Sequence, residues 1–142
     1  MKRRTIIKAP ALIGLATESS IGSTNNLRPS NFVLVHGTWH GGWVWKDVAR
    51  ILRARGHRVL TPTCTGCGDR VHLSSPNVGL ETHITDIENS IYWEEMDRFI
   101  LVGHSFSGVT ITGVADRMRE RVERIIFFDA LVPREGRMSG VV

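Results

Sequence analysis

The sequence has few cysteines, and this limits the sites that cysteine can form. It contains only Cys64 and Cys67, which make a single C-x-x-C. A zinc site needs further Cys or His ligands at suitable spacing, and a thioredoxin-like redox pair should begin a helix. This pair lies instead in a loop rich in threonine and glycine. We expect an ordinary loop without a metal; a local disulfide and a redox role stay open as alternatives.

The sequence also lacks a long apolar run and a basic excess in its main part. No stretch approaches the roughly 20 apolar residues that a membrane-spanning helix needs. Residues 1–31 hold five basic residues and one acidic residue, which accounts for the whole net charge of +4. Residues 32–142 are therefore balanced, whereas a nucleic-acid-binding domain should carry a basic surface. We expect no membrane span and no nucleic-acid partner.

The first 31 residues differ in composition from the rest. A basic start at residues 1–8 precedes a short apolar run at residues 9–16 and a polar segment at residues 17–31. This order is typical of an export signal, and the pair Arg3 and Arg4 resembles a twin-arginine motif, although no A-x-A cleavage site follows. We expect a leader that directs the protein to the periplasm or the exterior, or else a disordered tail on a cytoplasmic protein.

Residues 32–142 alternate between strand and helix patterns. Short apolar runs at 32–35, 57–61, 97–102 and 122–128 are typical of strands. Helical spacing occurs at 43–55, 80–91 and 109–118, and one face of the first of these helices carries Val44, Val48, Ile51 and Leu52. Residues 62–79 have no regular period and predict a long loop. The alternation predicts an α/β domain whose parallel sheet of about four strands has helices on both faces.

The third apolar run leads into a short segment that predicts a nucleophile. Residues 103–108 read GHSFSG, in which small residues stand two before and two after Ser105. A small-x-Ser-x-small pattern between a strand and a helix is typical of a nucleophile elbow, a tight turn that presents a serine above the sheet. We therefore predict Ser105 as the catalytic nucleophile, with Gly103, Ser107 and Gly108 as the small residues of the turn. An ordinary strand–turn–helix with a chance serine is the alternative.

A serine esterase also needs two N–H donors for the oxyanion of its tetrahedral intermediate. One should be the backbone N–H after the nucleophile, here that of Phe106, and the other should come from the loop after the first strand. That loop, HGTWHGG at residues 36–42, is rich in glycine, and Gly37 allows its backbone to turn. We predict the N–H of Thr38 as the second donor, with Trp39, His40 and His104 supporting the pocket or the elbow.

Several motifs in chain order resemble those of a known family. They are FVLVHGTWHGGWVW at 32–45, TPTCTGCGDR at 61–70, GLETHITD at 79–86, LVGHS at 101–105 and FFDALVP at 127–133. Together they resemble bacterial α/β-hydrolases related to the plant methylesterase and hydroxynitrile lyase branch, over residues 32 to about 137. The resemblance implies a cofactor-free esterase of small ester substrates and the sheet order second, first, third, fourth strand. It also implies leucines where Cys64 and Cys67 stand, which favours the ordinary-loop interpretation of the C-x-x-C.

The sequence departs from the family pattern in one respect. In this fold the triad acid and histidine follow the nucleophile, after a further strand, and neither segment occurs before Val142. We expect a truncated protein, a fragment or half of an assembly, in which the fourth strand is an exposed edge open to self-association. His104 or His40 as a substitute base, and Asp129 as the acid, are weaker alternatives.

The leading interpretation is therefore a serine hydrolase that cleaves a small carboxylic ester through an acyl-enzyme on Ser105. A hydroxynitrile-lyase-like enzyme on the same fold is one alternative. Another is an inactive fragment that binds a ligand or a partner chain. A dinucleotide-binding domain is disfavoured because no G-x-G-x-x-G follows the first strand.

Overall fold

The computed structural model describes residues 28–134 and 137–138. Its elements in chain order are β1 (Asn31–Val35), the 3-10 helix η1 (Gly42–Trp45), α1 (Lys46–Ala54), β2 (Arg58–Leu60), the 3-10 helix η2 (Gly68–Leu73), α2 (Leu80–Trp93), β3 (Phe99–Ser105), α3 (Ser107–Arg117), β4 (Val122–Ala130), β5 (Pro133–Arg134) and β6 (Arg137–Met138). The predicted leader lies outside the described residues as far as residue 27. No helix of the described part is long and apolar enough to cross a bilayer.

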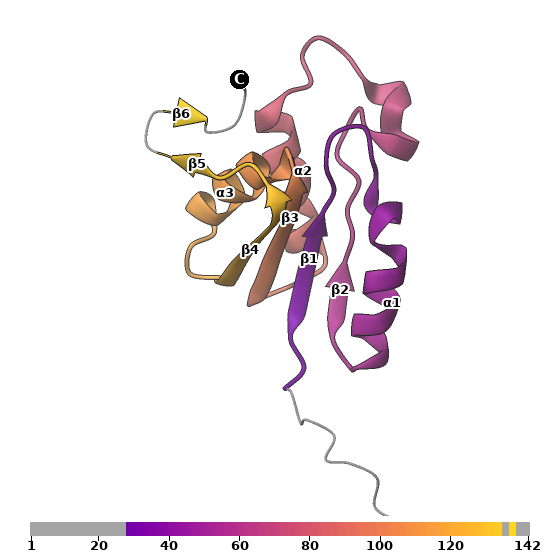
Figure 1. Ribbon diagram of the computed structural model, residues 1–142, viewed down its shortest axis with the longest axis vertical. Coiled ribbons are helices and arrows are strands. Elements are labelled where there is room, and N and C mark those ends of the chain that lie inside the picture. Colours follow the sequence, from indigo (N-terminus) through magenta and orange to yellow (C-terminus); the bar gives the residue numbers. More distant parts are fainter. Residues whose placement is uncertain (1–27, 135–136, 139–142) are drawn as a thin grey trace, which may run out of the picture.

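Four strands form one parallel sheet in the order β2-β1-β3-β4 (Figure 1). This confirms the predicted fold class and the strand order that the family resemblance implied. Because the strands are parallel, the carboxyl ends of β1, β3 and β4 meet at one edge of the sheet. Val35 at the end of β1 is in register with Gly103 in β3, which brings the glycine-rich loop beside the elbow.

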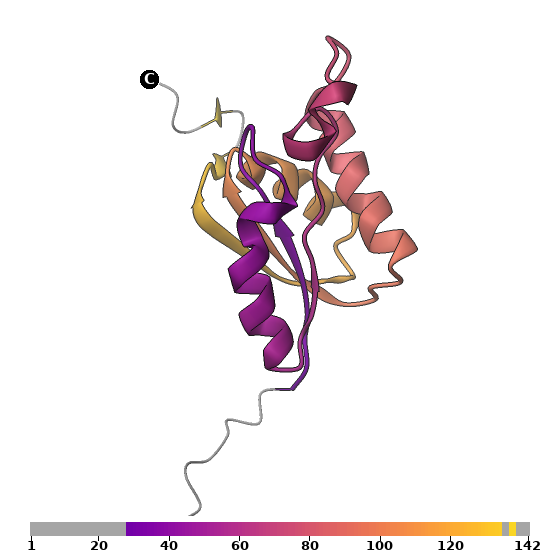
Figure 2. The ribbon, with the colours of Figure 1, turned by 90° about the vertical axis from the view of Figure 1, so that its right-hand side faces the viewer.

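Helices cover both faces of the sheet, as predicted (Figures 1 and 2). On one face, Trp45 and Ala49 pack on Leu34, Val59 and Val102. On the other face, α2 and α3 form the larger cluster with β1 and β3; its fully buried members include Ile87, Ile91, Phe99, Leu101 and Ile111. Strands β1 and β3 contribute side chains to both clusters, because successive residues of a strand point to opposite faces of the sheet.

The first helix differs from its prediction. Val48 and Ile51 are 42% and 43% exposed, whereas Ala49 is buried against the sheet. The sequence pattern assumed one continuous α-helix, but its first turn is the 3-10 helix η1. A 3-10 turn has about 3.0 residues rather than 3.6, so it shifts the phase of the helix that follows.

The ends of several other elements also differ from the predictions. The segment at residues 62–79 contains η2, so it is not wholly irregular. Strand β3 continues to Ser105 and β4 to Ala130, and the β5–β6 hairpin was not predicted. Polar residues such as His104 and Asp129 end the apolar runs early in the sequence, whereas strand pairing continues through them.

Candidate active site

Ser105 is the last residue of β3 and lies on a sharp turn into α3. Its φ is 56°, a left-handed conformation that is uncommon for residues other than glycine. Such a conformation persists only where the surroundings hold it, and it is concentrated at functional sites. The Ser105 carbonyl accepts a hydrogen bond from the Leu131 N–H at 3.0 Å, which fixes the turn from the chain after β4.

The glycines of this turn leave no room for a side chain. A Cβ on Gly103 would lie 2.7 Å from Cδ1 of Ile111 on α3. A Cβ on Gly108 would lie 2.0 Å from the carbonyl oxygen of Leu131. The predicted need for small residues at these two positions therefore has a direct steric cause.

Ser107 has a role that its small size did not predict. Its side chain is buried, and its hydroxyl lies 3.0 Å from the carbonyl oxygen of Val35 and 2.8 Å from that of His104. The hydroxyl therefore links the first turn of α3 to the ends of β1 and β3. The only signal in the sequence was a serine in place of the more usual glycine of the elbow pattern.

The glycine-rich loop after β1 lies directly against the elbow. A Cβ on Gly37 would be 3.0 Å from both Cβ of Ser105 and Nδ1 of His104, so only glycine fits without a shift. Thr38 and Phe106, the two predicted oxyanion donors, line one cavity of about 120 Å³. The structure thus brings the glycine-rich loop, Ser105 and Phe106 together at the carboxyl end of the sheet.

His36 is buried at the start of this loop, and both of its ring nitrogens make hydrogen bonds to the backbone. Its Nδ1 lies 2.7 Å from the Gly37 carbonyl oxygen, and its Nε2 accepts a hydrogen bond from the Cys64 N–H at 3.0 Å. Burial lowers the pKa of His36, although the bond to Gly37 opposes that shift. The ring therefore connects the glycine-rich loop to the loop that carries the cysteines.

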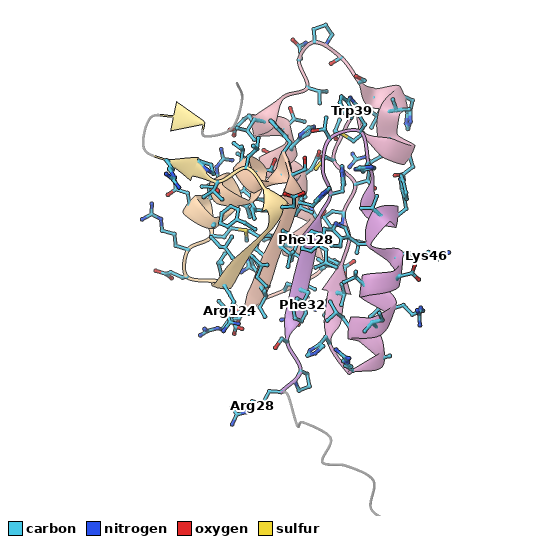
Figure 3. The ribbon with its side chains drawn as sticks, in the orientation of Figure 1. Arg28, Phe32, Trp39, Lys46, Arg124 and Phe128 are labelled. Carbon is cyan, nitrogen blue, oxygen red and sulfur yellow. The ribbon has the colours of Figure 1, made fainter. Side chains whose placement is uncertain are left out.

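The other predicted pocket residues are Trp39, His40 and His104. Trp39 is 87% exposed with a φ of 64° and lies beyond the carboxyl end of β1 (Figure 3). The rings of His40 and His104 are 6.3 Å apart, and His104 also packs near Trp45 and Phe128. The Nδ1 of His40 is buried and has no hydrogen-bond partner among the described residues.

Asp129 lies on β4 next to the elbow. Strand pairing shifts register here, so that Ser105 pairs with Ala130, and Asp129 takes a φ of 43°. Its side chain is exposed. Among the described residues its carboxylate has no hydrogen bond to Ser105 or to a histidine, and the acid role stays a prediction.

Both cysteines line the cavity below the loop, and both are free thiols, so the local disulfide is absent. Burial raises the pKa of Cys64 to about 12. Burial also raises the pKa of Cys67, while a hydrogen bond from the Trp39 N–H opposes that shift. Protonated thiols in these positions act as packing groups rather than as nucleophiles.

Asp86, which the sequence did not single out as a functional residue, holds the cysteine loop to α2. Its carboxylate accepts hydrogen bonds from the Thr65 N–H at 2.6 Å and from the Thr65 hydroxyl at 2.9 Å. Arg70 lies 3.8 Å from the same carboxylate. This arrangement fixes the cavity wall that Cys64 and Cys67 provide.

Comparison with known proteins adds to this geometry. Residues 32–141 match the model of the alpha/beta hydrolase family. The chain is 58% identical over 107 residues to the carbendazim hydrolyzing esterase of Nocardioides sp. (strain SG-4G), covering 75% of this chain and 44% of that protein. It is 32% identical over 107 residues to the alpha-hydroxynitrile lyase of Arabidopsis thaliana, covering 75% and 42%.

A solved structure gives the same result for the fold. An extracellular alpha/beta-hydrolase from a Paenibacillus species superposes with a TM-score of 0.68 at 38% identity, over 75% of this chain and 43% of that chain. This chain therefore spans less than half the length of each of these proteins.

Proposed function

Because the chain belongs to the alpha/beta hydrolase family, we propose that the protein is a serine esterase that acts on a small carboxylic ester. The observation that carries this proposal is the position of Ser105. It stands on a left-handed turn and packs against Gly37, between the loop that holds Thr38 and the residue Phe106 that follows it. The esterase relative that is 58% identical supports the same reaction class.

In the proposed reaction, the Ser105 hydroxyl attacks the ester carbonyl carbon and loses its proton to a base. The carbonyl oxygen becomes an oxyanion, which the N–H groups of Thr38 and Phe106 stabilise, and the N-terminus of α3 adds its dipole. The alcohol then leaves with a proton, and water hydrolyses the acyl-enzyme. We expect the base to come from outside the described residues, since the His40 Nδ1 has no hydrogen-bond partner within them.

The test is ester hydrolysis by the full-length protein with Ser105→Ala as the variant. Short p-nitrophenyl esters and carbendazim are the substrates, the latter because of the relative that is named for it. Losing the nucleophile should lower kcat/KM at least about 10³-fold, since only oxyanion and binding contributions remain. Ser74→Ala, at an exposed serine, is the matched control. Hydrolysis that Ser105→Ala leaves unchanged would rule the proposal out.

A hydroxynitrile lyase is the second candidate, favoured by the similarity to the plant lyase. A lyase would cleave a cyanohydrin to cyanide and a carbonyl compound without an acyl-enzyme. Cyanide release from mandelonitrile, together with no hydrolysis of esters and no labelling of Ser105 by a fluorophosphonate, would favour the lyase. Covalent labelling together with ester hydrolysis would favour the esterase.

An inactive fragment that binds a ligand or a partner chain is the third candidate, because the buried Nδ1 of His40, near the elbow, has no hydrogen-bond partner among the described residues. Labelling of Ser105 by a fluorophosphonate in the 142-residue chain alone would contradict it.

We also propose that the leader exports the protein; a neighbour in structure is extracellular. Secretion of a reporter fused to residues 1–31, abolished by Arg3→Lys with Arg4→Lys, tests that proposal.

A further inference from the structure

His36 joins two loops through its two ring nitrogens, and the proposed chemistry does not use it. The carbonyl oxygen of Gly37 only accepts hydrogen bonds, so Nδ1 at 2.7 Å must donate. The Cys64 N–H only donates, so Nε2 at 3.0 Å must accept. These two contacts are satisfied together by one form of the ring, the neutral Nδ1–H tautomer.

The Gly37 carbonyl belongs to the same peptide unit as the Thr38 N–H. A trans peptide is planar, with its C=O and N–H on opposite sides, and the described residues contain no cis peptide. The His40 N–H also donates to the Gly37 oxygen, at the longer distance of 3.3 Å. Holding the oxygen therefore also fixes the direction of the Thr38 N–H.

We propose that His36 is a positioning residue that sets the direction of the Thr38 N–H through the Gly37 carbonyl. The inference rests on the proposed esterase function, in which this N–H stabilises the oxyanion. His36 does not touch the reacting atoms. It acts through one peptide plane, and the Cys64 N–H keeps its ring in the tautomer that this requires.

The surroundings of the ring favour this neutral tautomer. His36 is only 3% exposed, and the ionisable groups that act on it are His83 on α2, His40, and Asp69 on η2. The two histidines disfavour a positive charge on His36, and Asp69 favours it weakly. A second ring proton would also place an N–H on Nε2 against the Cys64 N–H, so two donors would face each other.

A pair of amide variants separates positioning from simple packing. His36→Asn places an amide N–H near the position of Nδ1, where it can still donate to Gly37. His36→Gln places its amide near the position of Nε2, where it can accept from Cys64 but does not reach Gly37 in the same way. Both side chains are neutral and polar, and thermal unfolding of the full-length variants monitors whether each is folded.

For the full-length esterase we expect His36→Gln to lower kcat by roughly 10- to 100-fold with KM changed less than about threefold, since a misdirected oxyanion donor acts on the transition state. His36→Asn should keep kcat within about fivefold of the wild type. Equal kcat values for the two variants, whether both high or both low, would overturn the proposal, as would a change confined to KM.

A spectroscopic measurement does not depend on activity. The ¹⁵N chemical shifts of His36 should report the Nδ1–H tautomer, with a one-bond proton coupling at Nδ1 and none at Nε2 at neutral pH. A proton on Nε2 would overturn the inference. A wild type without esterase activity but with this tautomer would contradict the proposed function and leave the hydrogen-bond arrangement of His36 supported.

Discussion

Ser105 holds a backbone conformation that costs about 1–3 kcal/mol for a residue with a side chain. Its neighbours at the residue scale maintain this conformation. The Leu131 N–H bonds its carbonyl, Gly37 packs on its Cβ, and the Ser107 hydroxyl lies between the ends of two strands. Leu131, Gly37 and Val35 are all far from the elbow in sequence, so the turn depends on the folded sheet.

The first prediction concerns Ser107. Ser107→Ala should lower the free energy of unfolding by about 1–3 kcal/mol, because the Val35 and His104 carbonyl oxygens lose the one hydroxyl proton that lies between them. Ser107→Gly should cost at least as much, although it restores the usual elbow pattern. Urea unfolding measures both, with the exposed Ser74→Ala as the control. A Ser107→Gly variant as stable as the wild type would show that only size matters here.

The second prediction concerns pH. Burial raises the pKa of Cys64 from 9.0 to about 12, so the folded state keeps its proton longer than the unfolded state. The protonated Cys64 thiol makes its full contribution to the free energy of unfolding below pH 9. Above it the unfolded chain ionises first, and stability falls with rising pH by up to about 1.4 kcal/mol per unit until pH 12. Urea unfolding between pH 8 and 11 should therefore show a shallower slope for Cys64→Ser than for the wild type; equal slopes would contradict the prediction.

At the scale of elements, the site depends on how α2 and the loop after β2 are joined. Asp86 on α2 accepts hydrogen bonds from the N–H and the hydroxyl of Thr65, which lies within the turn from Cys64 to Cys67. A charged side chain on α2 thus fixes the position of the loop after β2. Packing of α2 on β3 through Ile87 and Ile91 fixes the other end of that connection.

The third prediction tests this connection. Asp86→Ala should lower the free energy of unfolding by about 1.5–3 kcal/mol, since it removes two hydrogen bonds to a charged group. Amide exchange at Thr65 and along η2 should rise more than exchange in β3. Asp47→Ala is the control: its side chain is 85% exposed, and its pairing with Arg50 should contribute less than about 1 kcal/mol. Equal losses in the two variants would exclude the proposed connection.

How far the sequence predicted these elements depended on the kind of signal. The spacing of Leu80, Ile84, Ile87 and Ile91 predicted α2, because a continuous α-helix has a fixed period; the three isoleucines are buried, whereas Leu80 at the first position is 38% exposed. Val48 and Ile51 were misplaced because η1 changes that period. The contacts of Ser107 with Val35, of His36 with Cys64 and of Asp86 with Thr65 could not be predicted, since each joins residues at least 21 positions apart in the chain. The strand order came from the family resemblance alone.

On the scale of the whole molecule, α1 covers only part of its face of the sheet. The β4 strand stands at the edge, and Ile126 and Phe128 are 37% and 58% exposed on the same strand (Figures 1 and 3). An apolar strand at a sheet edge favours pairing with another chain. This observation supports the proposed self-association through β4.

The fourth prediction is that the 142-residue chain self-associates through β4. Ile126→Lys with Phe128→Lys should shift the weight-average mass in sedimentation equilibrium toward that of a monomer, because charge on an edge strand opposes pairing. Val48→Lys with Ile51→Lys is the matched control, at similar exposure on α1. A monomeric wild type, or an equal effect of both double variants, would rule out association through this strand.

The hydrogen bond from the Leu131 N–H to the Ser105 carbonyl has a consequence for synthesis on the ribosome. The carbonyl of Leu131 is also the group that excludes any side chain at Gly108. A nascent chain that has emerged only as far as Phe128 can pair much of β4 with β3, yet it lacks both contacts. Until the residues after β4 have left the exit tunnel, the nucleophile turn is without these two contacts that surround it in the folded chain.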